Sequence, residues 1–440
     1  MSLPDTPAAA DPGPAPDPGS SSKTGDGAEH STAALAEPTT KVTARWVTGL
    51  VLVNVGINAA FFGPINIFIA EQATGIDETN KEAIASLVLG CGAAVSLVAN
   101  PLFGALSDRT VSGFGRRSPW VLGGAVLATA ALLALSGATA VALMVLFWCL
   151  VQLGANAAYA AITAAIPDRV PVLQRGGVGG VAALGQTAGI LLGSVFGAVV
   201  SGNYMVGYAL CAAALLFSVL PYLFHRNDPP LPRALRPPFS WRSFLRGFWI
   251  SPARHPDFAW AWLTRFLVNV CNQLTIVYLI FFLGDVLKLE SPALGVLILT
   301  GIYAALVMVT AVIAGPWSDR LGRRKPFVIG SSVLIALAGL TMAFFPVWTG
   351  ALVGAAILGV GFGAYQAVDF ALLTQVLPQA ADRGKDMGVI NVAASLPQVF
   401  ATGLAFLAVT YFGGYFTLFI TAALMGLLGA VFVVKIKGVR

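Results

Sequence analysis

Two charged residues stand inside long apolar runs of this sequence, where charge is rare. Arg265 lies in AWLTRFLVNVCNQ and Asp369 lies in GAYQAVDFALL. An ionised side chain inside a bilayer is costly when it is unpaired, and such residues commonly carry protons or bind ions and substrates. Both residues are therefore candidates for coupling transport to an ion. The alternatives are a permanent structural ion pair, or two side chains that each extend towards the membrane surface.

Uncharged polar side chains occur in four of the apolar runs. Amides both donate and accept hydrogen bonds, and with neighbouring aromatic rings they suit a neutral ligand rich in hydroxyl groups. Gln152, Asn156 and Tyr159 recur at i, i+4 and i+7, which places them on one helix face. The alternative is hydrogen bonding between packed helices, which membrane proteins use routinely. The candidate substrate-binding residues are Asn54, Asn58, Phe62, Gln152, Asn156, Tyr159, Asn269, Asn272, Gln273, Tyr365 and Gln366.

The elements that position these residues follow from the composition. Of 440 residues 57% are hydrophobic and only 10% are charged, and the mean hydropathy is +0.80. Soluble domains carry about 25% charged residues, so the composition excludes a water-soluble enzyme. A helix needs roughly 20 apolar residues to cross a bilayer, whereas the strands of a membrane barrel are about ten residues long and alternate. We predict an all-α membrane protein with twelve transmembrane helices, at 46–70, 83–106, 119–138, 141–166, 178–200, 204–224, 258–283, 292–315, 326–346, 350–376, 388–411 and 414–434.

The basic residues predict the orientation in the membrane. With the N-terminus in the cytoplasm, only Lys81 and Lys288 of the basic loop residues fall outside, in agreement with the positive-inside rule. The expected location is the inner (cytoplasmic) cell membrane, crossed many times, with both termini in the cytoplasm. Residues 1–40 are rich in Pro, Ala, Gly and Ser and predict a disordered cytoplasmic tail. Residues 225–257 predict a cytoplasmic linker, in which FSWRSFLRGFWI at 239–250 indicates a short interfacial helix.

An internal repeat divides the chain into two halves, residues 41–224 and 258–440. GALSDR at 104–109 recurs as GPWSDR at 315–320, and each copy is followed by Gly-Arg-Arg, at 115–117 and 322–324. Repeated halves of this kind build transporters whose substrate site lies between them near the bilayer midplane. Acids beside arginines at a membrane boundary can form charge-assisted hydrogen bonds. The alternative is that these arginines only bind lipid phosphate.

These motifs resemble the major facilitator superfamily over residues 46–434. The longer first copy, SDRTVSGFGRRSPW, resembles the sucrose-carrier branch with its glycoside–pentoside–hexuronide symporters. The resemblance implies two pseudo-symmetric six-helix bundles, with segments one, four, seven and ten lining a central cavity. It also implies a conformational latch in the outward-open state, the first motif copy closing against segment eleven and the second against segment five. The latch residues would be Asp108, Arg109, Arg116, Arg117, Asp319, Arg320, Arg323 and Arg324.

Within that fold Arg265 and Asp369 fall at matching depths. Each is seven residues from the cytoplasmic end of its segment, about 10 Å at 1.5 Å per residue. We predict that they pair beside the cavity and that protonation or substrate binding weakens the pair. Plant sucrose symporters carry an aspartate and an arginine in segment four where this chain has Gln152 and Thr163. The plant coupling mechanism is therefore not expected here.

The expected function is secondary active transport of a sugar or glycoside by alternating access, coupled to protons. The alternative is a proton-driven efflux carrier for a drug or secondary metabolite. The sequence contains no G-x-x-x-x-G-K-[ST] loop, and no side-chain constellation in it predicts an enzyme, a metal site or a cofactor. The expected partners are the small-molecule solute, the proton and the bilayer, without nucleic acid. We expect a monomer.

Overall fold

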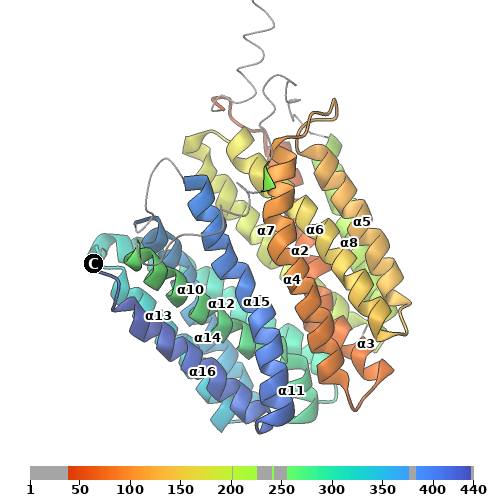
Figure 1. Ribbon diagram of the computed structural model, residues 1–440, viewed down its shortest axis with the longest axis vertical. Helices are drawn as coiled ribbons and strands as arrows, with labels where there is room; N and C mark the ends of the chain where they lie inside the picture. The colour runs from red at the N-terminus through yellow and green to blue at the C-terminus, as the bar shows by residue number, and fades with distance from the viewer. Residues whose placement is uncertain (1–37, 201, 225–239, 242–254, 376–382, 438–440) are drawn as a thin grey trace, which may run out of the picture.

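The computed structural model describes residues 38–200, 202–224, 240–241, 255–375 and 383–437, and over these residues the regular structure is helical (Figure 1). The first half contains α2 (Ala44–Gly63), η1 (Pro64–Phe68), α3 (Ile69–Ile76), α4 (Lys81–Asp108), α5 (Ser118–Ser136), α6 (Val141–Arg169), α7 (Val172–Val199) and α8 (Tyr204–Phe224). The second half contains α10 (Pro256–Val277), α11 (Leu279–Asp285), α12 (Pro292–Leu321), α13 (Lys325–Phe344), α14 (Trp348–Gln375), α15 (Arg383–Tyr411) and α16 (Gly414–Val433).

All twelve expected spans correspond to helices. In the described part of the chain, eleven stretches are long and apolar enough to cross a membrane, with α2–α3 and α10–α11 each counted as one. The twelfth helix, α15, has 29 residues, and its apolar stretch among the described side chains is Leu396–Tyr411. The helices also extend past the apolar segments, so the motif residue Asp108 is the last residue of α4.

The packing of the first bundle repeats in the second. Helix α2 packs against α7 and α8, as α10 packs against α15 and α16. Likewise α6 packs against α4 and α5, as α14 packs against α12 and α13. Each helix therefore has an equivalent with equivalent neighbours, which confirms the expected fold of two pseudo-symmetric bundles. Most of the expected tail (1–40), of the linker (225–257) and of its interfacial helix (239–250) lies outside the described residues.

Glycines bring α2 and α7 close together. A Cβ added at Gly189 would lie 2.4 Å from the carbonyl oxygen of Val55, and one at Gly193 would lie 2.6 Å from the amide nitrogen of Gly63. Small residues are needed at such crossings because lipid supplies no hydrophobic force between helices, so stability comes from close packing.

The first helix of each bundle is interrupted at an equivalent position. In the first half η1 is a π-helical turn that starts at Pro64. In the second half α10 ends at Val277 and α11 begins at Leu279, with Tyr278 at φ −111° and ψ 20°. The repeat offset of 211 residues places Tyr278 opposite Ile67, inside η1. Proline cannot donate the helical hydrogen bond, but proline explains only the first interruption, since position 278 is a tyrosine.

The two halves meet most closely at one end, which we call the far side. We call the opposite end, where α8 stops and α10 starts, the linker side. Helix α4 packs against α15 and α7 against α12, again an equivalent pair of contacts. In Figure 1 α4 and α15 lie next to one another, and α3 and α11 both lie at the lower end, which is the far side.

Candidate functional site

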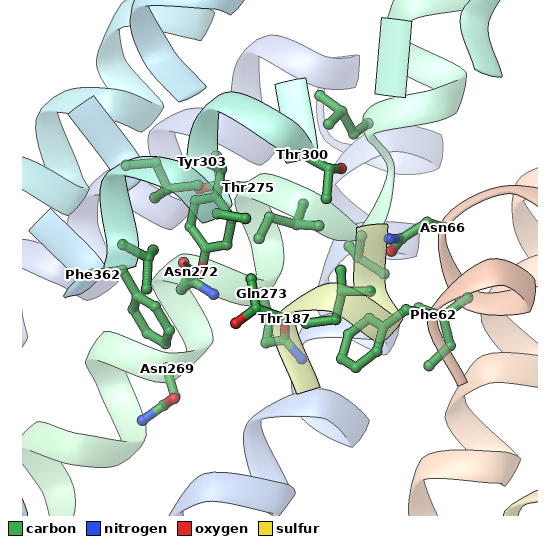
Figure 2. A pocket seen from close by; sticks show the side chains of 18 of the residues that line it. Phe62, Asn66, Thr187, Asn269, Asn272, Gln273, Thr275, Thr300, Tyr303 and Phe362 are labelled. Atoms are coloured by element: carbon green, nitrogen blue, oxygen red, sulfur yellow. Dashed lines mark hydrogen bonds between the residues drawn. The ribbon is translucent and has the colours of Figure 1, made fainter. Parts of the chain in front are cut away.

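A cavity of about 840 Å³ lies between the two bundles. Its walls come from α2, η1, α4, α6 and α7 of the first half and from α10 to α15 of the second. Figure 2 shows side chains from both halves directed into the same space, with Phe62 and Asn66 facing Gln273, Tyr303 and Phe362. The volume falls within the range of about 300–1,000 Å³ that is typical of pockets for small organic ligands.

The described lining is polar but uncharged. None of the described side chains that line the cavity is Asp, Glu, Lys, Arg or His. Hydrogen-bonding capacity comes from amides and hydroxyls, which together can donate to and accept from a neutral ligand. These residues are Asn66, Gln152, Gln186, Thr187, Asn269, Asn272, Gln273, Thr275, Thr300, Tyr303, Gln366, Gln398 and Thr402.

Six of the eleven predicted substrate-binding residues line this cavity: Phe62, Gln152, Asn269, Asn272, Gln273 and Gln366. Asn272 and Gln273 sit on consecutive positions of α10, and the Tyr303 hydroxyl donates to Asn272 Oδ1 at 3.4 Å. Figure 2 shows Gln273 of α10 and Thr187 of α7 among the residues that line this cavity, so both halves contribute polar side chains to it.

Two of the predicted residues lie instead at the crossing of α2 and α7. Asn54 Nδ2 donates to the Leu50 carbonyl and Asn58 Nδ2 to the Asn54 carbonyl, both at 2.8 Å. A Cβ added at Gly189 would lie 2.7 Å from the Cβ of Asn58. Both amides are outside the cavity lining because they turn towards α7, where they bond to the backbone of their own helix.

Asn156, Tyr159 and Tyr365 are also outside the lining. Asn156 Oδ1 accepts from Ser96 Oγ at 3.1 Å, a bond between α6 and α4. Tyr159 accepts from Gln186 Nε2 at 3.3 Å, a bond between α6 and α7. Tyr365 is buried within α14, one turn before Asp369. Asn156 and Tyr159 therefore agree with the alternative interpretation, in which polar side chains form hydrogen bonds between packed helices.

Lining residues on segments two, five, eight, nine and eleven were not predicted from the sequence, among them Gln186, Tyr303 and Gln398. Two of these carried a signal. Gln186 ends the stretch RGGVGGVAALGQ and Gln398 ends RGKDMGVINVAASLPQ, the equivalent stretch of the repeat. With the repeat offset of 211 residues Gln186 corresponds to Pro397, the neighbour of Gln398, so a glutamine recurs near the same place in both halves.

The two charged residues inside the apolar runs form an ion pair. Arg265 Nη1 of α10 bonds to Asp369 Oδ2 of α14. The Asp369 side chain is only 3% exposed, and the Arg265 Nε has no hydrogen-bond partner among the described atoms. Asn269 and Gln366, which line the cavity, lie within one helical turn of the pair, and Asn269 Nδ2 donates to the Arg265 carbonyl at 2.8 Å. The predicted pairing is present, and the role of the pair in coupling stays a prediction.

Comparison with known proteins agrees with this architecture. The family model described as Major Facilitator Superfamily matches residues 47–310 and 292–439. The chain belongs to the Major Facilitator Superfamily. It is therefore a multi-pass membrane protein of a transporter family.

Solved structures of the same fold include a peptide transporter POT in complex with sulfate, with a TM-score of 0.72 and 13% identity over 92% of this chain and 97% of that one. A POT family transporter in complex with 5-aminolevulinic acid has a TM-score of 0.72 and 14% identity over 92% of this chain and all of that one. No curated protein matches the sequence. Identities this low show the superfamily fold alone, and the resemblance to the sucrose-carrier branch stays a prediction.

The first copy of the superfamily motif forms an ionic cluster on the linker side. Arg117 bonds to Asp108 Oδ1 at 2.6 Å and to Asp168 Oδ2 at 2.8 Å, and Arg116 bonds to Asp168 Oδ2 at 2.5 Å. Burial lowers the pKa of Arg117, but the carboxylates of Asp168 and Asp108 outweigh it and raise the pKa above its usual value. Arg109 Nη1 donates to the Ala105 carbonyl at 2.5 Å. These contacts join α4, α5 and α6 within one half.

The latch between the halves stays a prediction. Arg117 contacts Asp168 of α6, which the sequence analysis had not named. The side chains at the start of α15, which the first motif was expected to contact, are outside the described part, as is the side chain of Asp319. Arg320 and Arg323 are exposed, and Arg324 is half-buried.

Hydrogen bonds and an ion pair close the far side between the halves of this superfamily member. Lys81 Nζ of α4 bonds to Asp285 Oδ1 of α11 at 2.7 Å, and Tyr415 donates to Asp285 Oδ2 at 2.8 Å. The Tyr278 hydroxyl hydrogen-bonds Ser86 Oγ and donates to the Glu82 carbonyl at 2.9 Å. We call Lys81, Ser86, Tyr278 and Asp285 the far-side gate. The sequence analysis did not find these residues, because each is an ordinary polar residue near a helix end.

Proposed function

We propose that this protein is a secondary active transporter that moves a neutral polar solute, a sugar or a glycoside, by alternating access. The observation that carries the proposal is the cavity between the two bundles, whose described lining offers many amides and hydroxyls and no charge. Hydroxyl groups lose water when they enter such a cavity, and amides on several helices replace those hydrogen bonds.

The absence of charge in the described lining argues against a peptide as the substrate, although three of the solved structures of similar fold are peptide transporters. A peptide carries a charged amino group and a charged carboxylate. A charge that leaves water without a partner pays a heavy desolvation cost. An uncharged solute avoids this cost and is the better match to the residues that line this cavity.

The Arg265–Asp369 pair supports proton coupling. Asp369 is hydrogen-bonded to Arg265, and proton uptake removes the carboxylate charge on which this charge-assisted bond depends, so protonation and the ion pair are linked. Asn269 and Gln366 connect the pair to the cavity, each within one turn. A solute that binds these amides shifts α10 relative to α14 and thereby changes the proton affinity of Asp369.

The basic residues of the loops support a cytoplasmic linker side and cytoplasmic termini in the cell inner membrane. With that orientation the far-side gate is the extracytoplasmic gate, and the described conformation is closed towards the outside. We further propose that a monomer is the working unit, since each chain contains both halves of the cavity.

Efflux of a drug or secondary metabolite is the second candidate function. The observation that favours it is the apolar part of the cavity lining, which includes Met308, Val312 and Leu358. An apolar surface of this kind binds apolar ligands by burying their apolar area, without hydrogen bonds.

The test is transport by purified protein in proteoliposomes with an imposed pH gradient of either direction. We expect saturable flux of a labelled methyl glycoside down the proton gradient, together with exchange of labelled for unlabelled solute without a gradient. Gln273→Ala should raise the KM, whereas Met205→Ala, an exposed position outside the cavity, should not. Absence of both flux and exchange for uncharged sugars and glycosides would refute the proposal. Proton-driven movement restricted to apolar drugs would establish the second candidate.

A further inference from the structure

The cavity lining contains an apolar region, which we call the apolar wall: Leu299, Val307, Met308 and Val312 of α12 and Leu358 of α14. Tyr303 of α12 and Gln366 of α14 are polar residues beside it. Other parts of the lining carry amides from α10, α6 and α7. The hydroxyl groups of a solute that is polar on all sides would contact the apolar wall, whose side chains cannot form hydrogen bonds with them.

The apolar wall continues to the surface between α7 and α12. Met308 is 37% exposed and Val312 is 76% exposed, although both line the cavity, and Leu184 of α7 lines it and is 48% exposed. Helices α7 and α12 pack against each other. Exposed apolar side chains thus border the cavity on both halves, whereas the buried Asn272 is hydrogen-bonded to Tyr303.

The size of the cavity agrees with a solute larger than one sugar ring. Its volume of about 840 Å³ is near the upper end of the range for drug-sized ligands, about 300–1,000 Å³. The amides of α10 occupy only a part of this space, and the wall of α12 and α14 bounds the remainder.

We propose that the solute is an amphiphilic glycoside, whose sugar binds the amides of α10 and whose uncharged alkyl or aryl group lies along the wall of α12 and α14. This inference rests on the proposed function and narrows its substrate class. Free sugars and methyl glycosides bind the same amides but leave the apolar wall unused. They are therefore weaker ligands than glycosides with a larger apolar group.

The test is calorimetric binding of a series of alkyl glucosides and galactosides, from methyl to pentyl, to the full chain in lipid nanodiscs, with empty nanodiscs subtracted. Burial of one methylene contributes about 0.8 kcal/mol, so we expect the affinity to rise about fourfold per added carbon. Met308→Gln should flatten this dependence. Met205→Gln, the same change at an exposed methionine outside the cavity, should leave the dependence unchanged.

The outcomes separate this inference from the proposed function. If methyl glycosides bind and are transported but affinity does not change with chain length, the apolar wall plays no part and only the further inference fails. If pentanol binds as tightly as pentyl glycoside, the sugar is not recognised and both proposals fail. If the affinity still rises with chain length in Met308→Gln and also after Val312 and Leu358 are changed to polar residues, the alkyl group binds elsewhere and the inference is overturned.

Discussion

At the scale of residues, Arg265 and Asp369 are the clearest case in which the residue types alone predicted the chemistry. Each is charged in a stretch where charge is expensive, and each lowers the cost of the other. In the structure the carboxylate is almost fully buried and the guanidinium keeps one nitrogen without a partner. A pair with such a spare donor is able to change its bonding when a solute or a proton arrives.

We expect Asp369→Asn to abolish accumulation driven by a pH gradient and to leave solute exchange in place. The reason is that asparagine cannot take up the proton but can still bond to Arg265. Proteoliposome uptake and counterflow measure the two activities separately. Loss of one partner of a buried pair costs about 3–5 kcal/mol, so the double variant Arg265→Gln/Asp369→Asn serves as a control that leaves no unpaired charge. Gradient-driven accumulation by either variant would contradict the coupling role.

Asn58 and Gln273 give a matched comparison of two amides, one at a helix crossing and one in the cavity. Gln273→Ala should raise the KM for solute several-fold, because a hydrogen bond to ligand contributes about 0.5–1.5 kcal/mol. Asn58→Ala should lower the thermal stability in detergent and leave the KM unchanged. Measurement of KM and melting temperature for both variants decides the matter, and a raised KM for Asn58→Ala alone would put the substrate site elsewhere.

At the scale of elements, glycines decide how closely the helices approach. Gly189→Ala should destabilise the protein by about 1–3 kcal/mol, because the added Cβ would lie 2.4 Å from the Val55 carbonyl oxygen of α2. Gly179→Ala, on the same helix with nothing within 4 Å of the added Cβ, should be neutral or stabilising by up to about 1 kcal/mol. Thermal unfolding in detergent followed by fluorescence tests both, and equal stability of the two variants would contradict the close crossing of α2 and α7.

The interruptions in the first helix of each bundle also belong to this scale. Both η1 and the break at Tyr278 separate a longer linker-side helix from a short far-side one, α3 or α11. The short piece α11 contacts the other half through Asp285, which bonds to Lys81 of α4. A break at this position lets a far-side piece change direction while the longer piece keeps its packing.

At the scale of the whole molecule, the far-side gate links the two halves, and we expect it to hold the described conformation. Tyr278→Phe removes two hydrogen bonds between the halves, at about 1 kcal/mol each, so the population open on the far side should increase roughly tenfold or more. Spin labels at Thr79 and Glu290, both exposed, would report this as a longer distance by double electron–electron resonance, in a background without native cysteines. Tyr411→Phe, at an exposed tyrosine of α15, is the control. An unchanged distance distribution in Tyr278→Phe would show that this hydroxyl does not hold the gate.

The sequence by itself determined the twelve helices, the two similar halves and the two charged residues that pair. It could do so because a bilayer accepts only long apolar segments with satisfied backbones and tolerates few charges, so these features are local in the chain. It also placed Asn272 and Gln273 correctly in the cavity. Only the tertiary structure decided that Asn54 and Asn58 turn towards α7, that Asp168 joins the motif arginines, and that α12 supplies an apolar wall. The direction in which a helix face points depends on its rotation against neighbours from distant parts of the chain, and in helices that are apolar all round no periodicity records that rotation.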